Sequence, residues 1–193
     1  MIDVNSNIDF FLPDGEKIKN INKVQCDVLV IGGGCSGVAA GIQSARLSAK
    51  TIIVEETEFL GGMITSAGVS AFDGNKFALG GGIFGELRKK IENYYGGADK
   101  TYTGWISLTC FEPKVAAGFL QEMADSEPNL QILYKTSLIK IIKNNEKVTA
   151  AVVKNSENNY LLIEAKVTIE ATEFGDVLQL ADVPFRIGRD SQD

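Results

Sequence analysis

Cys26-Asp27-Val28-Leu29-Val30-Ile31-Gly32-Gly33-Gly34-Cys35-Ser36-Gly37 is the stretch of sequence that decides the fold. The apolar run 28–31 is typical of a buried parallel strand, and it leads into glycines with the spacing G-x-G-x-x-G. Gly32 allows a sharp turn out of the strand, and Gly34 leaves the backbone bare for a close ligand. Gly37 allows the following helix to pack tightly. The stretch predicts a helix whose first N–H groups face a phosphate.

The residues that follow agree with a dinucleotide-binding unit. Apolar positions predict a helix over 38–48, and the β-branched run 51–54 predicts a second strand that ends at Glu55. An acid placed roughly twenty residues after the first glycine can accept hydrogen bonds from the ribose hydroxyls of an adenosine. The alternative is a structural glycine turn in another kind of α/β protein. We predict a dinucleotide site.

The composition disfavours several classes of partner and site. Apolar residues make up 45% of the 193, charged residues 23%, and the net charge is −6, which argues against nucleic acid or an anionic membrane surface as a partner. No apolar run is long enough to span a membrane, and residues 1–5 do not resemble a secretory signal, so we expect a cytoplasmic protein. Three scattered cysteines indicate neither a disulfide framework nor a zinc site, and the lack of histidine excludes a histidine-based catalytic triad. We expect no metal.

The remaining sequence predicts one α/β domain over 24–193, preceded by an extension over 1–23. We expect the extension to form a short strand or hairpin with a turn at Pro13-Asp14-Gly15. Helices are predicted over 83–95, 114–125 (with Pro113 in the first turn) and 177–181. Strands are predicted over 130–134, 138–142, 148–153, 160–164 and 167–171. The fold class is therefore α/β, a Rossmann-like domain with a parallel central sheet and an inserted antiparallel three-strand β-meander.

A second glycine pair, Gly61-Gly62, follows the acidic pair Glu55-Glu56 after a few residues. Ordinary helix sequence usually follows the acid in a nicotinamide dehydrogenase. Here we expect a close backbone approach to the pyrophosphate or ribityl chain of a cofactor. A flexible loop is the alternative.

Taken together, these stretches resemble the FAD-dependent oxidoreductases of the glutathione-reductase-like superfamily. The resemblance rests on 31–37, on Val54-Glu55 followed by 60–62, on the helix after Pro113, on the strands between 132 and 153, and on 169–177 with its follow-on 180–189. It covers nearly everything after Val24. The turn at Glu173-Phe174 departs from the family's usual Ala-Thr-Gly or Ala-Thr-Tyr-Glu-Gly-Asp.

The resemblance implies FAD as the cofactor and assigns roles to individual residues. Gly32, Gly34, Cys35, Ser36 and Gly37 would lie along the FAD pyrophosphate. Glu55, with its neighbour Glu56, would hold the adenosine ribose, and Gly61, Gly62 and Met63 would line the path to the ribityl chain. The backbone around Ser137 and Leu138 would meet the adenine edge. Thr172 and Gly175 would form a second phosphate-side turn, in which Asp176 caps the short helix.

The resemblance also implies an enzyme that transfers hydride between flavin and a small organic substrate, although no catalytic residue can be named. Family members continue well past Gly188-Arg189, so we expect the N-terminal part of a longer enzyme, or one that a second chain completes. Two alternatives stay open. One is a non-catalytic nucleotide-binding fragment or subunit, and the other is an NAD(P)-dependent dehydrogenase.

Overall fold

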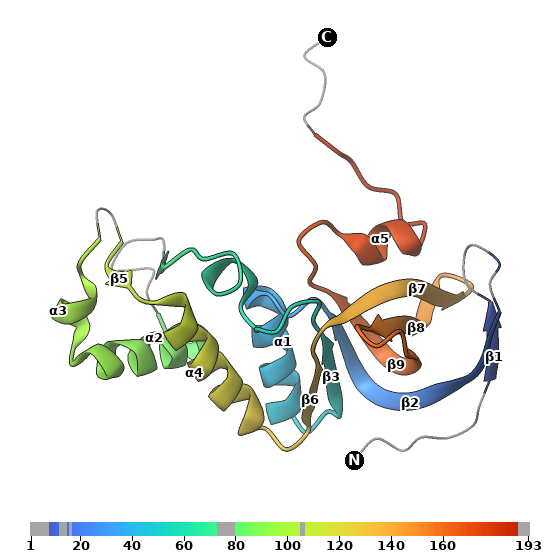
Figure 1. The fold of residues 1–193 in the computed structure, drawn as a ribbon, viewed down its shortest axis with the longest axis horizontal. Helices are drawn as coiled ribbons and strands as arrows, with labels where there is room; N and C mark the ends of the chain where they lie inside the picture. Colours follow the sequence, from blue (N-terminus) through green and yellow to red (C-terminus); the bar gives the residue numbers. More distant parts are fainter. Residues whose placement is uncertain (1–7, 12–14, 16, 73–79, 105–106, 189–193) are drawn as a thin grey trace, which may run out of the picture.

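The computed structural model describes residues 8–11, 15, 17–72, 80–104 and 107–188 (Figure 1). Its centre is a parallel sheet with the strand order β6-β3-β2-β9. These strands are β2 (Lys17–Ile31), β3 (Thr51–Val54), β6 (Leu130–Leu133) and β9 (Tyr160–Glu170). In register, Val28 lies opposite Thr51 on one side and opposite Val167 on the other. The predicted parallel central sheet is confirmed.

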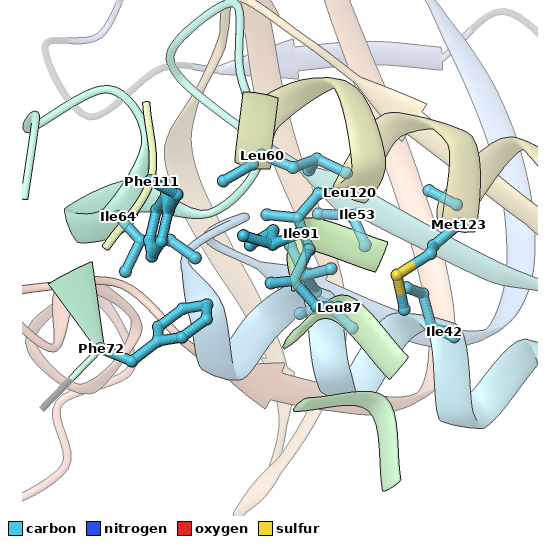
Figure 2. Packing of buried hydrophobic residues seen from close by; sticks show 14 residues of the cluster. Ile42, Ile53, Leu60, Ile64, Phe72, Leu87, Ile91, Phe111, Leu120 and Met123 are labelled. Atoms are coloured by element: carbon cyan, nitrogen blue, oxygen red, sulfur yellow. The ribbon is translucent and has the colours of Figure 1, made fainter. Parts of the chain in front are cut away.

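Three helices lie on one side of this sheet; the first packs on its strands, and the other two pack mainly on the first and on each other (Figure 1). They are α1 (Cys35–Arg46), α2 (Gly82–Tyr95) and α4 (Pro113–Asp125). Gly41 brings α1 close to the sheet, because a Cβ there would lie 2.4 Å from Cδ1 of Ile53. Figure 2 shows the resulting core, with Ile42 and Met123 at one end, Phe72 and Phe111 at the other, and Ile91 between them. The core fixes α1, and with it the glycine turn.

An antiparallel meander covers the other face of the sheet (Figure 1). It consists of β7 (Thr136–Asn144), β8 (Lys147–Asn155) and the first half of β9. Side chains of the parallel strands, such as Leu29 and Ile52, meet side chains of the meander, such as Val153 and Ile163, in a second core.

The predicted three-strand meander is present, and its last strand continues into the parallel sheet. The sequence predicted separate strands over 160–164 and 167–171, but β9 runs unbroken from Tyr160 to Glu170. It pairs with β8 and also, over most of its length, with β2. The intervening Ala165-Lys166 pair resembles a break in sequence, yet it stays extended because the strand pairs with β2 on both sides of it, and the exposed Lys166 forms an ion pair with Asp27 at 2.6 Å.

The N-terminal extension is continuous with the central sheet. β1 (Ile8–Phe11) pairs antiparallel with the start of β2, as the predicted hairpin requires. β2 passes through Lys23 and Val24 without interruption, so the division of the chain between them stays a prediction. Of the predicted turn, Pro13 and Asp14 lie outside the described residues, as does Arg189.

Short elements complete the fold. They are η1 (Gly62–Ile64), α3 (Ala98–Thr101), α5 (Asp176–Leu180) and the two-stranded pair β4 (Ala71–Phe72) and β5 (Thr109–Cys110). Within the part of the chain that the structure describes, no helix has the length and apolar character needed to cross a bilayer. The same residues contain no cluster of three or more potential metal-ligating side chains.

Candidate functional site

The first glycine turn connects β2 to α1, and two of its glycines are required by packing. Gly32 has φ 99°, and a Cβ there would lie 2.4 Å from the carbonyl oxygen of Ala171. A Cβ at Gly37 would lie 1.9 Å from the carbonyl oxygen of Gly32. Neither position has room for a side chain, so both glycines allow strand, turn and helix to meet closely.

Gly34 differs from these two glycines. Its φ of −64° and ψ of −175° suit any residue, and the nearest heavy atom to a Cβ there would be Oε1 of Glu173, at 3.7 Å. Gly34 is the N-cap of α1, and no side chain among the described residues caps this helix. The start of α1 therefore lies beside a space that, of the described residues, only the end of the Glu173 side chain enters and that an anion can occupy.

The Glu55 side chain lies beside this turn and is held rigidly. Its Oε2 accepts a hydrogen bond from the backbone N–H of Gly33 at 2.8 Å, and its Oε1 accepts one from the N–H of Thr57 at 2.8 Å. The residue is only 7% exposed. Each carboxylate oxygen has a second lone pair, so Glu55 can still accept ligand hydroxyls. The sequence did not predict the role of Gly33, where a Cβ would lie 2.7 Å from Oε2 of Glu55.

The second glycine pair lies directly against the first turn. The N–H of Gly61 donates to the carbonyl oxygen of Gly33 at 2.8 Å, and the Cys35 thiol donates to the carbonyl oxygen of Gly61 at 3.2 Å. Gly61 and Gly62 have φ values of 105° and 50°. A Cβ at Gly62 would lie 3.1 Å from Cα of Gly34. The close backbone approach expected here is thus made to the first glycine turn.

A third turn, between β9 and α5, completes the site. The Thr172 hydroxyl accepts hydrogen bonds from the N–H groups of Gly175 and Asp176, each at 3.0 Å. The Glu170 carboxylate accepts from the N–H of Thr172 at 2.5 Å and from that of Val177 at 2.6 Å. The expectation that Asp176 caps α5 is wrong, because Thr172 and Glu170 accept these bonds. No sequence pattern predicted that Glu170 would accept these hydrogen bonds.

The three turns surround a cavity of about 410 Å³. Eight of the residues assigned from the sequence line it: Gly32, Gly34, Glu55, Glu56, Gly62, Met63, Leu138 and Thr172. Lining residues that were not assigned to the cofactor include Gly33, Thr57, Ser66, Ala67, Thr136, Glu173, Phe174 and Asp176. The cavity runs between the ends of β2, β3 and β9, where parallel sheets of this kind bind ligands.

The other six assigned residues lie outside this lining: Cys35, Ser36, Gly37, Gly61, Ser137 and Gly175. Ser137 is excluded because neighbouring residues of a strand point to opposite faces, so its neighbours Thr136 and Leu138 face the cavity instead. Gly37, Gly61 and Gly175 shape the turns through packing or a positive φ.

Cys35 lines a second, apolar cavity of about 260 Å³ between α1 and α2. Burial raises the pKa of its thiol, so the group is uncharged at neutral pH and is a poor nucleophile.

Comparison with known proteins agrees with this geometry. The family model described as FAD dependent oxidoreductase matches residues 27–193. The 4-oxocyclohex-2-ene-1-carboxylate 5-dehydrogenase of Sinomonas cyclohexanicum is 33% identical over 78 residues, which are 40% of this chain and 13% of that protein.

Solved structures show a similar fold. The geranylgeranyl bacteriochlorophyll reductase-like protein of Thermoplasma acidophilum has a TM-score of 0.55 at 21% identity, over 79% of this chain and 40% of that one. A myxobacterial FAD-dependent chondrochloren halogenase has a TM-score of 0.54 at 15% identity, over 77% of this chain and 37% of the halogenase chain. This chain therefore spans less than half the length of each of these three proteins. The family match extends over most of the chain, and the chain belongs to the family of FAD-dependent oxidoreductases.

Proposed function

We propose that this chain binds FAD in the 410 Å³ cavity and serves as the FAD-binding part of an oxidoreductase. The observation that carries the proposal is the space in front of Gly34. Among the described residues, a Cβ there would meet only the end of the Glu173 side chain, at 3.7 Å, at the uncapped start of α1, whereas packing leaves no room for a Cβ at Gly32 or Gly37. A diphosphate needs such a bare stretch of backbone at a helix N-terminus.

Each part of the cavity suits one part of FAD. Glu55 and Glu56 would hold the adenosine ribose, and Leu138, with Ser137 beside it, would meet the adenine. The backbone of Gly32, Gly34, Cys35, Ser36 and Gly37 would follow the pyrophosphate. Gly61, Gly62 and Met63 would line the path to the ribityl chain, opposite the turn of Thr172 and Gly175. Bound FAD supplies the redox chemistry, while the protein binds the cofactor and sets its orientation.

The reaction that we propose is hydride transfer between flavin and a small organic substrate. It is supported by the family match and by the dehydrogenase named among the relatives. We also propose that further polypeptide, from the same chain or from a second one, completes the wall around the flavin ring. Phe174 at the cavity is 92% exposed and Met63 is 55% exposed, which leaves apolar surface for such a partner to cover.

The three free thiols suit a cytoplasmic location.

An absorbance spectrum of the purified, desalted protein tests the proposal. Bands near ~450 nm that stay with the protein are expected, because flavin is coloured and a bound nicotinamide is not. A colourless protein that takes up FAD only weakly would instead favour the non-catalytic nucleotide-binding alternative. A colourless protein that binds NAD(H) in preference to FAD would favour the nicotinamide-dependent dehydrogenase.

A further inference from the structure

Glu173 lies where the proposed FAD site should be most favourable to negative charge. Its Oε1 is 3.7 Å from the Cβ position of Gly34 and 3.4 Å from that of Gly62. The carboxylate therefore stands between the two glycine loops, over the start of α1. It is a solvent-exposed side chain on the turn that follows β9, with freedom to leave this place.

The position of the Glu173 carboxylate matters because the charged residues that line the cavity are all acidic. Four carboxylates are among the lining residues, Glu55, Glu56, Glu173 and Asp176, and none of the lining residues is a lysine or an arginine. A diphosphate brings negative charge to the same place. The helix dipole and the backbone N–H groups of α1 attract either anion, so the carboxylate and the diphosphate compete for one location.

We propose that Glu173 sets the affinity and the salt dependence of dinucleotide binding by opposing the diphosphate at the start of α1. This inference rests on the proposed FAD site. In the free protein the carboxylate takes the position of the anion, and the side chain must move aside when the cofactor binds. Two negative charges about 6 Å from a carboxylate, even at the dielectric constant of water, correspond to about a tenfold loss of affinity.

The decisive variant is Glu173→Gln, which keeps the size of the side chain and removes its charge. FAD affinity is measured by quenching of flavin fluorescence in the full chain, at about 20 mM and about 1 M salt, where the Debye length falls to about 3 Å. We expect FAD to bind the variant about tenfold more tightly than the wild type at low salt, and nearly equally at high salt.

Two controls separate the charge of Glu173 from other effects. Glu146→Gln removes the same charge at the β7–β8 turn, remote from the cavity, and should leave FAD affinity unchanged. Adenosine, which carries no phosphate, should bind Glu173→Gln and the wild type equally, whereas ADP should show the same gain as FAD. Thermal unfolding of each variant checks that the fold is intact.

The inference is overturned if Glu173→Gln binds FAD with the wild-type affinity, binds it more weakly, or shows the same gain at high salt. In those cases FAD still binds and the proposed function stands. If neither protein binds FAD at either salt concentration, the proposed function and this inference fail together.

Discussion

Replacing Gly34 by valine should separate cofactor binding from folding. The backbone at Gly34, with φ −64° and ψ −175°, is one that valine adopts readily. The nearest atom to the new Cβ would be Oε1 of Glu173, at 3.7 Å, which is an ordinary van der Waals distance at the end of a movable side chain. A valine should restrict the unfolded chain and lose some N-cap preference, so the free energy of unfolding should change by less than about 1 kcal/mol.

The effect on FAD should be far larger. The valine side chain would fill the space in which the diphosphate approaches the backbone at the start of α1. Two charge-assisted hydrogen bonds from backbone N–H groups, at about 1.5–3 kcal/mol each, would be lost. The dissociation constant for FAD should therefore rise at least about 100-fold.

The matched control is Gly32→Ala in the same turn. There φ is 99° and the new Cβ would lie 2.4 Å from the carbonyl oxygen of Ala171, so the fold itself should be destabilised, by about 2 kcal/mol or more. Flavin absorbance after desalting measures retention of the cofactor, and thermal or urea denaturation measures stability. A Gly34→Val protein that keeps FAD with near wild-type affinity would refute the site, and one that unfolds would refute the packing argument.

Three further predictions concern single residues. Glu55→Gln should weaken FAD binding and also lower the free energy of unfolding, each by about 1–3 kcal/mol. The reason is that the N–H group of either Gly33 or Thr57 would face the NH2 group of the amide in place of an oxygen acceptor. Unchanged values in FAD titration and urea denaturation would contradict this. Ile91→Ala, in the fully buried core of Figure 2, should cost about 2–5 kcal/mol in urea denaturation, whereas a cost below about 1 kcal/mol would mean that α2 is not packed as described. The Arg46 guanidinium lies 2.7 Å from the Glu86 carboxylate and holds the pKa of that carboxyl below its usual value of 4.5. The pair therefore stabilises the fold fully above pH 4.5, and this stabilisation is lost as the pH falls through the lowered pKa. Arg46→Gln should accordingly show a weaker loss of thermal stability than the wild type on acidification below pH 4.5, and equal losses would exclude the linkage.

Local sequence signals predicted the parts of the fold that depend on neighbouring residues. The strand before Gly32, the glycine turn, α1 and the acid at Glu55 all lie in one β-α-β unit, where spacing fixes geometry. The helices that begin near Ile83 and at Pro113 were likewise predicted from apolar periodicity and a proline at the first turn.

The features that the sequence did not predict depend on contacts between distant segments. The hydrogen bond from Gly33 to Glu55, the approach of Gly61 to Gly33 and the contact of Glu173 with Gly34 join segments that only the folded sheet brings together. The continuity of β9 was missed because the Ala165-Lys166 pair is held extended by pairing with β2, which is distant in the sequence. Thr136 was missed because the register of β7, which decides which of its side chains face the cavity, cannot be known from the sequence.

The pairing of β2 with β9 has a consequence for how the protein matures in the cell. Gln25 and Glu164 bond across a sequence separation of 139 residues, so β2 gains β9 as its neighbour only after that many further residues have been synthesised. At translation rates of about 5–20 residues per second, this delay is roughly 7–28 s. During that interval the nascent chain exposes a strand edge to chaperones or to aggregation. The turn carrying Thr172 and Glu173 follows β9 directly, so the cavity cannot be complete before β9 has been synthesised.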